Sequence, residues 1–114
     1  MLLRRLVPAL AFAALVASTA SASAQCDTRF TLRNSSSVQV NEFYFGSSSN
    51  PNWGRDRLGQ NVLSPGRTQD FRTAQSGPQD FKVIWENGDT AELRQIDICS
   101  TNEIVATQRG ISAR

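Results

Sequence analysis

Apolar and polar residues alternate with a period of two along most of the chain after residue 25, which is the pattern of strands that bury one face. Residues 29–33 predict a first strand that stops at a polar Asn/Ser run. Residues 38–45 predict a second strand, in which the apolar phase slips by one position at 41–42. Because one extra residue in a strand shifts the phase in this way, we expect a β-bulge there.

The middle of the chain carries a weaker alternation. Residues 58–63 predict a third strand that Gly59 interrupts. The dipeptide Pro65-Gly66 is a turn signal, and it leads into a short fourth strand around Phe71. A second polar loop is expected over 73–78.

The clearest local signal lies in the last third of the chain. Phe81, Val83 and Trp85 alternate with Lys82, Ile84 and Glu86, and Asn87-Gly88 then predicts a hairpin with a type I′ turn. The returning strand over 91–98 slips phase once more, and 104–107 is expected to be the last strand. Residues 108–114 are predicted to be a polar tail that frays.

These elements together predict an all-β fold. Six or seven short strands separated by frequent turns favour a small antiparallel β-sandwich of immunoglobulin-like size. The expected organisation is a cleaved signal helix over 1–24, a β-sandwich domain over 25–108 and a flexible tail over 109–114.

The first 24 residues have the composition of a secretory signal. A basic start, an apolar run over 6–16 and the small residues Ala22-Ser23-Ala24 follow in the expected order. A membrane anchor is the alternative, but the apolar run is shorter than the roughly 20 residues that a span needs. Arg4-Arg5 leaves a twin-arginine route open, and Gln25 before Cys26 fits a lipoprotein signal poorly. We therefore expect an exported protein, periplasmic or secreted, with no membrane span in its mature form.

Removal of the signal changes the charge of the protein. The precursor has 12 Lys/Arg and 10 Asp/Glu, and loss of Arg4 and Arg5 leaves cations and carboxylates equal in number. A neutral chain without a basic cluster is not expected to bind nucleic acid.

Two cysteines, Cys26 and Cys99, stand near the two ends of the mature chain. In an exported protein such a pair predicts one disulfide. Closing so long a loop stabilises a domain by roughly 4 kcal/mol in the chain-entropy model. A reactive thiol is the alternative, but it needs a neighbouring base or cation that the sequence does not suggest.

The absence of histidine excludes the commonest catalytic and metal-binding designs. Lys82 is the only lysine, and its phase places it on the outer face of a strand. We expect no enzyme and no cofactor. The alternative is a small hydrolase that uses a pair of carboxylates, although the carboxylates show no recognisable pairing: Asp80, Glu86, Asp89, Glu92, Asp97 and Glu103.

The loop over 46–59 is the best candidate for a binding surface. Trp53 and Tyr44 could form an aromatic platform beside polar Ser and Asn residues, with Asn52 at its edge. The alternative places Trp53 over the end of the sandwich as a plug. Trp85, in phase with the buried positions of its strand, is expected in the core.

Asp56 has two interpretations. With Asn50 and Asn52 it places three oxygen ligands in one loop, which resembles the start of a calcium-binding loop. The interpretation we favour is structural, with Asp56 bound to backbone amides, Arg55 or Arg57 so that it pins the loop. We therefore predict no metal site and keep Asp56 as a tentative member of the binding surface.

A set of short motifs runs through most of the mature chain: Asn34 with Ser36, Phe43-Tyr44, Ser47-Ser48-Ser49-Asn50, Trp53-Gly54-x-Asp56-x-Leu58-Gly59, Leu63-x-Pro65-Gly66, Trp85-x-Asn87-Gly88 and Asp97-x-Cys99. Together they resemble those of short exported bacterial proteins of unknown function. Members of that group often carry a cysteine just before the strand that corresponds to 81–86. Here Gly77-Pro78-Gln79 stands in that place and Cys26 is present instead. The resemblance implies an envelope or secreted location and a small β-domain, and it implies no activity.

The sequence thus predicts an exported β-domain that acts as a binding or envelope-associated module through the loop 46–59. Its expected partner is an envelope protein or a glycan. A carboxylate-dependent hydrolase and a purely structural envelope protein are the two alternatives.

Overall fold

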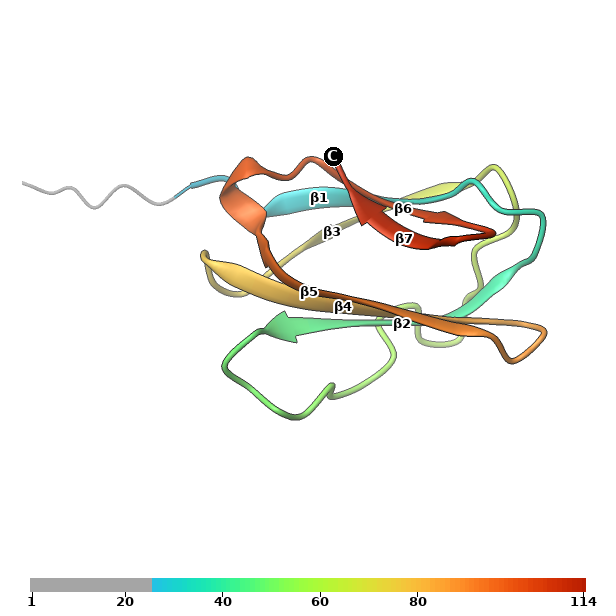
Figure 1. Cartoon of the computed structure of the whole chain (residues 1–114), viewed down its shortest axis with the longest axis horizontal. Coiled ribbons are helices and arrows are strands. Elements are labelled where there is room, and N and C mark those ends of the chain that lie inside the picture. The colour runs from blue at the N-terminus through green and yellow to red at the C-terminus, as the bar shows by residue number, and fades with distance from the viewer. Residues whose placement is uncertain (1–25) are drawn as a thin grey trace, which may run out of the picture.

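The computed structural model describes residues 26–114, so the predicted signal segment 1–24 lies outside the described residues. Two β-sheets stack face to face (Figure 1), which confirms the predicted β-sandwich. A short 3₁₀ helix, η1 (Ile98–Ser100), follows the fifth of seven strands. The strands are β1 (Arg29–Asn34), β2 (Val40–Ser47), β3 (Thr68–Arg72), β4 (Pro78–Trp85), β5 (Thr90–Asp97), β6 (Glu103–Thr107) and β7 (Gly110–Ala113).

The sheets differ in size and in pairing. The four-stranded sheet has the order β3-β1-β6-β7, and the three-stranded sheet has the order β2-β4-β5. All pairs are antiparallel except β1 with β6, which run parallel. The chain therefore crosses between the sheets after β1, and β6 returns beside β1 in the four-stranded sheet.

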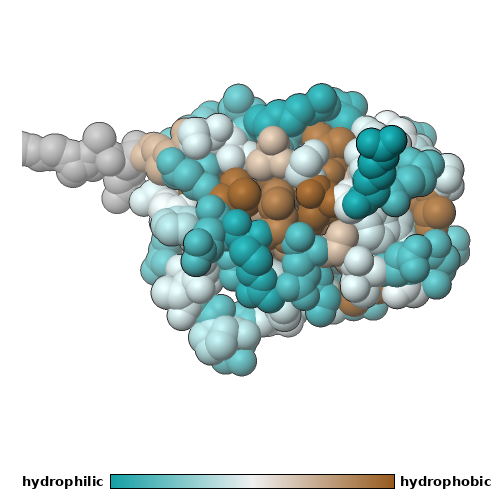
Figure 2. Space-filling view, in the orientation of Figure 1, coloured by the Kyte–Doolittle hydropathy of each residue, from teal (hydrophilic) through white to brown (hydrophobic). Residues whose placement is uncertain are grey.

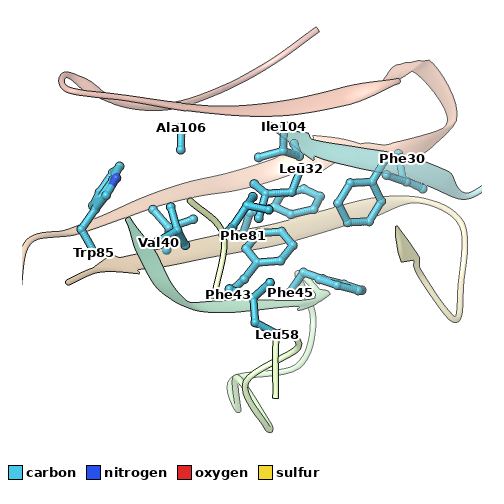
Figure 3. Packing of buried hydrophobic residues seen from close by; sticks show 13 residues of the cluster. Phe30, Leu32, Val40, Phe43, Phe45, Leu58, Phe81, Trp85, Ile104 and Ala106 are labelled. Carbon is cyan, nitrogen blue, oxygen red and sulfur yellow. The ribbon is translucent and has the colours of Figure 1, made fainter. Parts of the chain in front are cut away.

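The core lies between the sheets and is rich in phenylalanine (Figure 3). The Phe30 ring of β1 packs edge-on against the rings of Phe45 and Phe81, with centroids 5.1 and 5.4 Å apart. Phe43 and Phe71 belong to the same cluster. Burial of large apolar side chains is the main term that stabilises such a fold. The alternation of the sequence therefore identified the core strands correctly.

A buried polar network lies at one end of this core. Asn34 is fully buried and donates from Nδ2 to the backbone oxygens of Val38 and Leu63, both at 2.9 Å. Its Oδ1 accepts from the backbone N–H and the hydroxyl of Ser36. Trp85, 6% exposed as predicted for a core residue, donates its indole N–H to the Ser36 hydroxyl at 3.0 Å. The network joins the connection between β1 and β2 to β4 and to the segment before β3.

Both predicted phase slips coincide with shifts in the register of strand pairing. In β2 the register with β4 shifts between Val40 and Glu42, where the sequence predicted a bulge. In β5 the shift lies opposite Asp80, because Gln79 pairs with Ile96 while Phe81 pairs with Leu93. The extra residue at this second shift, Gln95, has a φ of 58°.

The predicted third strand over 58–63 is wrong. Only Leu63 makes a ladder contact, an isolated bridge with Val40. The rest of the segment is a loop along the outer edge of β2, where the Arg57 N–H donates to the Phe43 oxygen at 2.6 Å. Leu58 is apolar because it packs against the core from this loop, 3% exposed, and not because it belongs to a strand.

The hairpin at Asn87-Gly88 is confirmed, but its turn is not type I′. A type I′ turn needs positive φ at both central residues, and here Gly88 has a φ of 91° whereas Asn87 is not among the positive-φ residues. Gly88 N–H donates to the Trp85 oxygen and Trp85 N–H donates to the Asp89 oxygen, both at 2.9 Å. The connection is therefore a three-residue loop that ends in a left-handed glycine.

The flexible tail predicted over 109–114 is also wrong. Residues 110–113 form β7, which pairs with β6 and closes the four-stranded sheet. Arg114 continues the ladder, since its N–H and C=O bond to the backbone of Glu103 at 2.9 and 2.8 Å. The domain therefore extends to the end of the described chain.

The predicted disulfide is confirmed. Cys26 and Cys99 are joined by an S–S bond of 2.04 Å with Cα atoms 5.4 Å apart. The bond links the residues before β1 to η1 after β5, and so ties one sheet to the other. A disulfide fits an oxidising location outside the cytoplasm. Among the described residues, no helix has the length and apolar character that crossing a membrane requires.

Candidate functional site

Trp53 lies over the outer face of the three-stranded sheet and not over the end of the sandwich. The loop after β2 turns back on this face and places the indole ring above two cations. The Arg94 guanidinium of β5 lies 4.9 Å from the ring centroid, and the Lys82 ammonium of β4 lies 5.7 Å from it. Lys82 also lies 5.6 Å from the Tyr44 ring of β2. We call the four residues Tyr44, Trp53, Lys82 and Arg94, with the adjoining Asn50 and Asn52, the Trp53 surface.

The register of the sheet brings these side chains together. Tyr44 pairs with Lys82, and Lys82 pairs with Glu92 on the next strand, so the three side chains stand in one row on the outer face. Two of the predicted binding residues, Tyr44 and Trp53, thus flank one lysine. Lys82 was placed on an outer face by its phase alone, but its position between two aromatic rings depends on strand order, which the sequence does not show.

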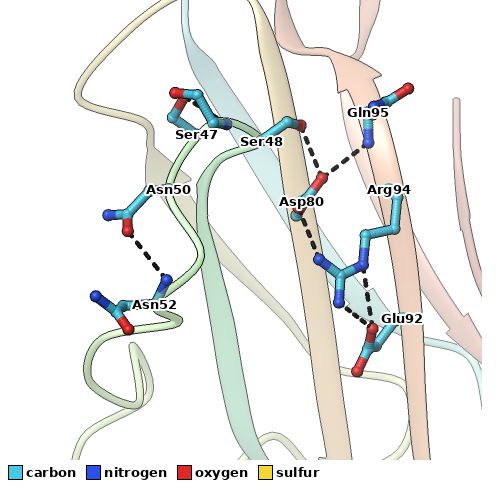
Figure 4. Close-up of polar contacts among 9 residues, drawn as sticks. Ser47, Ser48, Asn50, Asn52, Asp80, Glu92, Arg94 and Gln95 are labelled. Atoms are coloured by element: carbon cyan, nitrogen blue, oxygen red, sulfur yellow. Dashed lines mark hydrogen bonds and ion pairs between the residues drawn. The ribbon is translucent and has the colours of Figure 1, made fainter.

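Asp80 anchors the base of this surface (Figure 4). It is 5% exposed, and it accepts hydrogen bonds from the Ser48 hydroxyl at 2.7 Å, the Gln95 N–H at 2.9 Å and Arg94 at 2.9 Å. Burial favours the neutral acid, but these three donors outweigh it and hold the pKa of Asp80 below its usual value. The Asp80 carboxylate therefore fixes both the bulge of β5, at Gln95, and the Arg94 guanidinium beneath Trp53.

Arg94 is shared between two carboxylates. Besides Asp80 it contacts Glu92, with Nε 3.1 Å from Oε1. Glu92 stands opposite Lys82 in the register, yet its carboxylate is taken up by Arg94. No ion pair of Lys82 occurs in the part of the chain that the structure describes.

Tyr44 is held by a neighbour on its own strand. Its hydroxyl donates to the Glu42 carboxylate in a short hydrogen bond. This bond, with burial and the negative charge of Glu42, raises the pKa of Tyr44 to about 12. The hydrogen bond to Glu42 also fixes the Tyr44 ring beside Lys82.

The polar tip of the loop is exposed. Asn50 accepts the Asn52 N–H on its side-chain oxygen at 3.0 Å, and the Asn52 amide is left facing solvent (Figure 4). The cleft between this tip and the strands, lined among others by Trp53 and Arg94, has a volume of only about 10 Å³. This cleft is therefore too small to enclose an organic molecule.

Asp56, the fourth predicted residue, is not on this surface. Its Oδ1 accepts the N–H groups of Phe43 and Leu58, both at 2.9 Å, and so fastens the loop to the edge of β2. No ion pair with Arg55 or Arg57 is present among the described residues. Within residues 26–114, no three His, Cys, Asp or Glu side chains gather as a metal-binding group. The contacts of Asp56 are those of the structural role that we favoured over calcium binding.

We expect Asp56→Ala to lower the free energy of unfolding by about 2 kcal/mol, because two partly buried N–H groups lose a charged acceptor. The loss should be the same with calcium and with a chelator, as measured by urea denaturation. Asn52→Ala on the same loop is the matched control and should leave stability unchanged, because the Asn52 side chain is exposed and makes no hydrogen bond within residues 26–114. A calcium-dependent rise in Tm that needs Asp56 would contradict the structural role.

The other carboxylates that were considered for hydrolysis are engaged separately. Asp97 accepts the Cys99 N–H at 2.9 Å and caps η1. Glu103 binds Arg33 and Arg114, and these two cations hold the pKa of Glu103 below its usual value. Glu86 and Asp89 are exposed at the β4–β5 turn.

Comparisons of this chain with protein-family models, with curated proteins and with solved structures find no match. The resemblance to short exported bacterial proteins therefore stays a prediction. What the chain can bind has to be argued from the Trp53 surface itself.

Proposed function

We propose that this chain is an exported binding module that recognises a glycan of the cell envelope through the Trp53 surface. The observation that carries the proposal is the position of Trp53. A folded domain of this size normally buries its few large aromatic rings. The Trp53 ring instead lies outside the core, where the cations of Arg94 and Lys82 contact it. A partly exposed ring that is fixed in place is suited to contact a partner.

The chemistry around the ring favours a saccharide. One face of a sugar ring is apolar and stacks on an aromatic plane, while its hydroxyls need donors and acceptors nearby. The side-chain amides of Asn50 and Asn52 and the ammonium of Lys82 supply such groups at the edge of Trp53. The small volume of the cleft beside Trp53 favours an extended polymer that lies across the surface, because small-molecule sites are concave, with volumes of roughly 300 Å³ or more.

Retention of the purified mature protein on insoluble envelope polysaccharide, stripped of protein, tests the proposal. We expect wild-type protein to be retained and Trp53→Ala to bind at least tenfold more weakly, with little loss of stability. Val62→Ala is the matched control, because Val62 is apolar and 45% exposed but lies outside the Trp53 surface. Equal retention of the two variants, or none of the wild type, would contradict glycan binding.

Photocrosslinking in the producing cells separates a glycan from a protein partner. A probe at Asn52 reports on the Trp53 surface, and a probe at Glu86 on the exposed β4–β5 turn is the control. We expect no discrete protein adduct from either position. A protein adduct from Asn52 alone, together with failed polysaccharide retention, would replace the glycan by an envelope protein.

A further inference from the structure

Arg57 is a half-buried cation without a carboxylate partner in the described chain. The ion pairs of residues 26–114 involve four other arginines. Its guanidinium lies 4.1 Å from the centroid of the Phe45 ring, and Nη2 donates to the Phe45 oxygen at 3.0 Å. Its Nε is the one buried side-chain nitrogen or oxygen of the described residues that has no hydrogen-bond partner.

This arrangement is unfavourable unless something compensates the charge. Buried cations in proteins are normally paired, and buried N–H groups are normally bonded. Burial, with the neighbouring Arg55, lowers the pKa of Arg57, in keeping with the lack of an ion pair among residues 26–114. The nearest carboxylate in sequence, Asp56, has its Oδ1 turned to the amides of Phe43 and Leu58.

A small cleft, lined by both polar and apolar residues, lies against the same side chain. It has a volume of about 50 Å³ and is lined by Phe45, Gly46, Ser47, Arg57, residues 73–75 and Gln79. Gln79 is 2% exposed, and its Nε2 donates to the Gln75 oxygen at 3.2 Å, so its amide is fixed in the wall. The cleft exceeds the roughly 30 Å³ that one water occupies in the liquid. It is far smaller than the sites that hold small organic molecules.

We propose that this cleft binds an anion of the size of chloride or of a single carboxylate group, held by Arg57. The ion supplies the charge that Arg57 lacks. It also bridges the loop that carries Trp53 to residues 73–75 before β4. This cleft shares only Gly46 and Ser47 with the cleft between the loop tip and the strands, so the ion site does not require that the Trp53 surface binds a glycan.

The ³⁵Cl NMR linewidth of a chloride solution tests the site directly, because a bound halide relaxes faster. We expect excess linewidth from the wild type and from Arg55→Gln, and none from Arg57→Gln. Arg55 is the matched control, since it is an exposed arginine on the same loop and loses the same charge. Equal linewidths from the two variants would overturn the proposal.

Acetate distinguishes a free halide from a carboxylate. If the cleft accepts a carboxylate, acetate narrows the chloride line of the wild type by displacing the ion, whereas a bulky sulfonate at equal ionic strength leaves the line unchanged. Failure of acetate to compete would overturn the carboxylate assignment and restrict the site to halides. If the sulfonate also narrows the chloride line, the excess linewidth comes from weak attraction to surface charges, and the proposed anion site is overturned.

Diffraction from bromide-containing crystals is a second test of the site. It uses only the wild-type protein, so it can be carried out even if Arg57→Gln fails to fold. Crystals of the wild-type protein grown or soaked in bromide should show an anomalous peak against the Arg57 guanidinium, within the cleft lined by Gln79 and Ser47. Peaks confined to exposed arginines such as Arg29 and Arg109, with none at Arg57, would contradict the inference.

Discussion

Replacing Cys26 and Cys99 together with serine is expected to lower the free energy of unfolding by roughly 4 kcal/mol. The bond joins residues 73 positions apart and connects the two sheets, so its loss releases most of the chain in the unfolded state. For a domain of this size the loss is a large share of total stability. Urea denaturation, followed by the fluorescence of the buried Trp85, measures it.

Reduction of the wild-type protein provides the control for the serine variant. The reduced protein and the double variant should have the same denaturation midpoint, because both lack only the bond. Ser100→Ala, an exposed change next to Cys99, should leave the midpoint almost unchanged. A double variant within about 1 kcal/mol of the oxidised wild type would show that the two sheets hold together without the bond.

The second large effect is expected at Asn34. Asn34→Ala removes the donors to the buried oxygens of Val38 and Leu63 and the acceptor that orients Ser36. The Leu63 oxygen keeps its bond from the Val40 N–H and the Val38 oxygen keeps its bond from the Ser36 hydroxyl, but the buried Ser36 N–H loses its acceptor. Each lost hydrogen bond costs about 1 kcal/mol and a buried group without a partner costs about 1–3 kcal/mol, so we expect a loss of roughly 3 kcal/mol. Thermal and urea unfolding should both report it.

Asn61→Ala tests whether the loss comes from the network. Asn61 is an exposed asparagine before β3, and its side chain makes no hydrogen bond in the structure, so we expect no measurable change. Asn34→Asp keeps the oxygen that faces Ser36 but loses the two N–H donors, and it should destabilise nearly as much as alanine. An Asn34→Asp protein as stable as wild type would contradict the donor role of Nδ2.

The sequence was most informative where local pattern and burial agree. Alternation over 81–85 and in β1 predicted the core strands, because side chains of a strand point alternately to its two faces. The two phase slips predicted the bulges of β2 and β5, since one extra residue reverses the pointing of all that follow. The disulfide was predicted from the number of cysteines together with the expected export of the chain.

The errors occurred where a residue is apolar for a non-local reason. Leu58 packs against the core from a loop, so its hydrophobicity indicated a strand that does not exist. In the C-terminal segment, Ile111 and Ala113 alternate with polar residues, but two positions are too few to predict a strand without the partner β6. The turn at Asn87-Gly88 matched a two-residue motif, whereas pairing from Trp85 to Asp89 made the loop one residue longer.

The candidate surface was predicted only in part. Tyr44, Asn52 and Trp53 were identified from residue type and loop composition. The roles of Lys82, Arg94 and Asp80 depend on which strands are neighbours, and the unpaired Arg57 depends on the fold of the whole loop. An arginine that lacks a carboxylate cannot be distinguished in sequence from one that has a partner.

The loop that runs along β2 also affects whether this sheet edge can pair with a strand of another protein. A sheet edge with free N–H and C=O groups is a template on which another chain can add as a strand. Here β2, eight residues long, has its edge occupied at Val40 and Phe43 by residues of the loop. The equally long β5 is distorted at Gln95, while β3 and β7 have only five and four residues. Coverage, distortion or shortness thus guards each edge of the sandwich against added strands, and a change that frees the loop from β2 would expose an edge eight residues long.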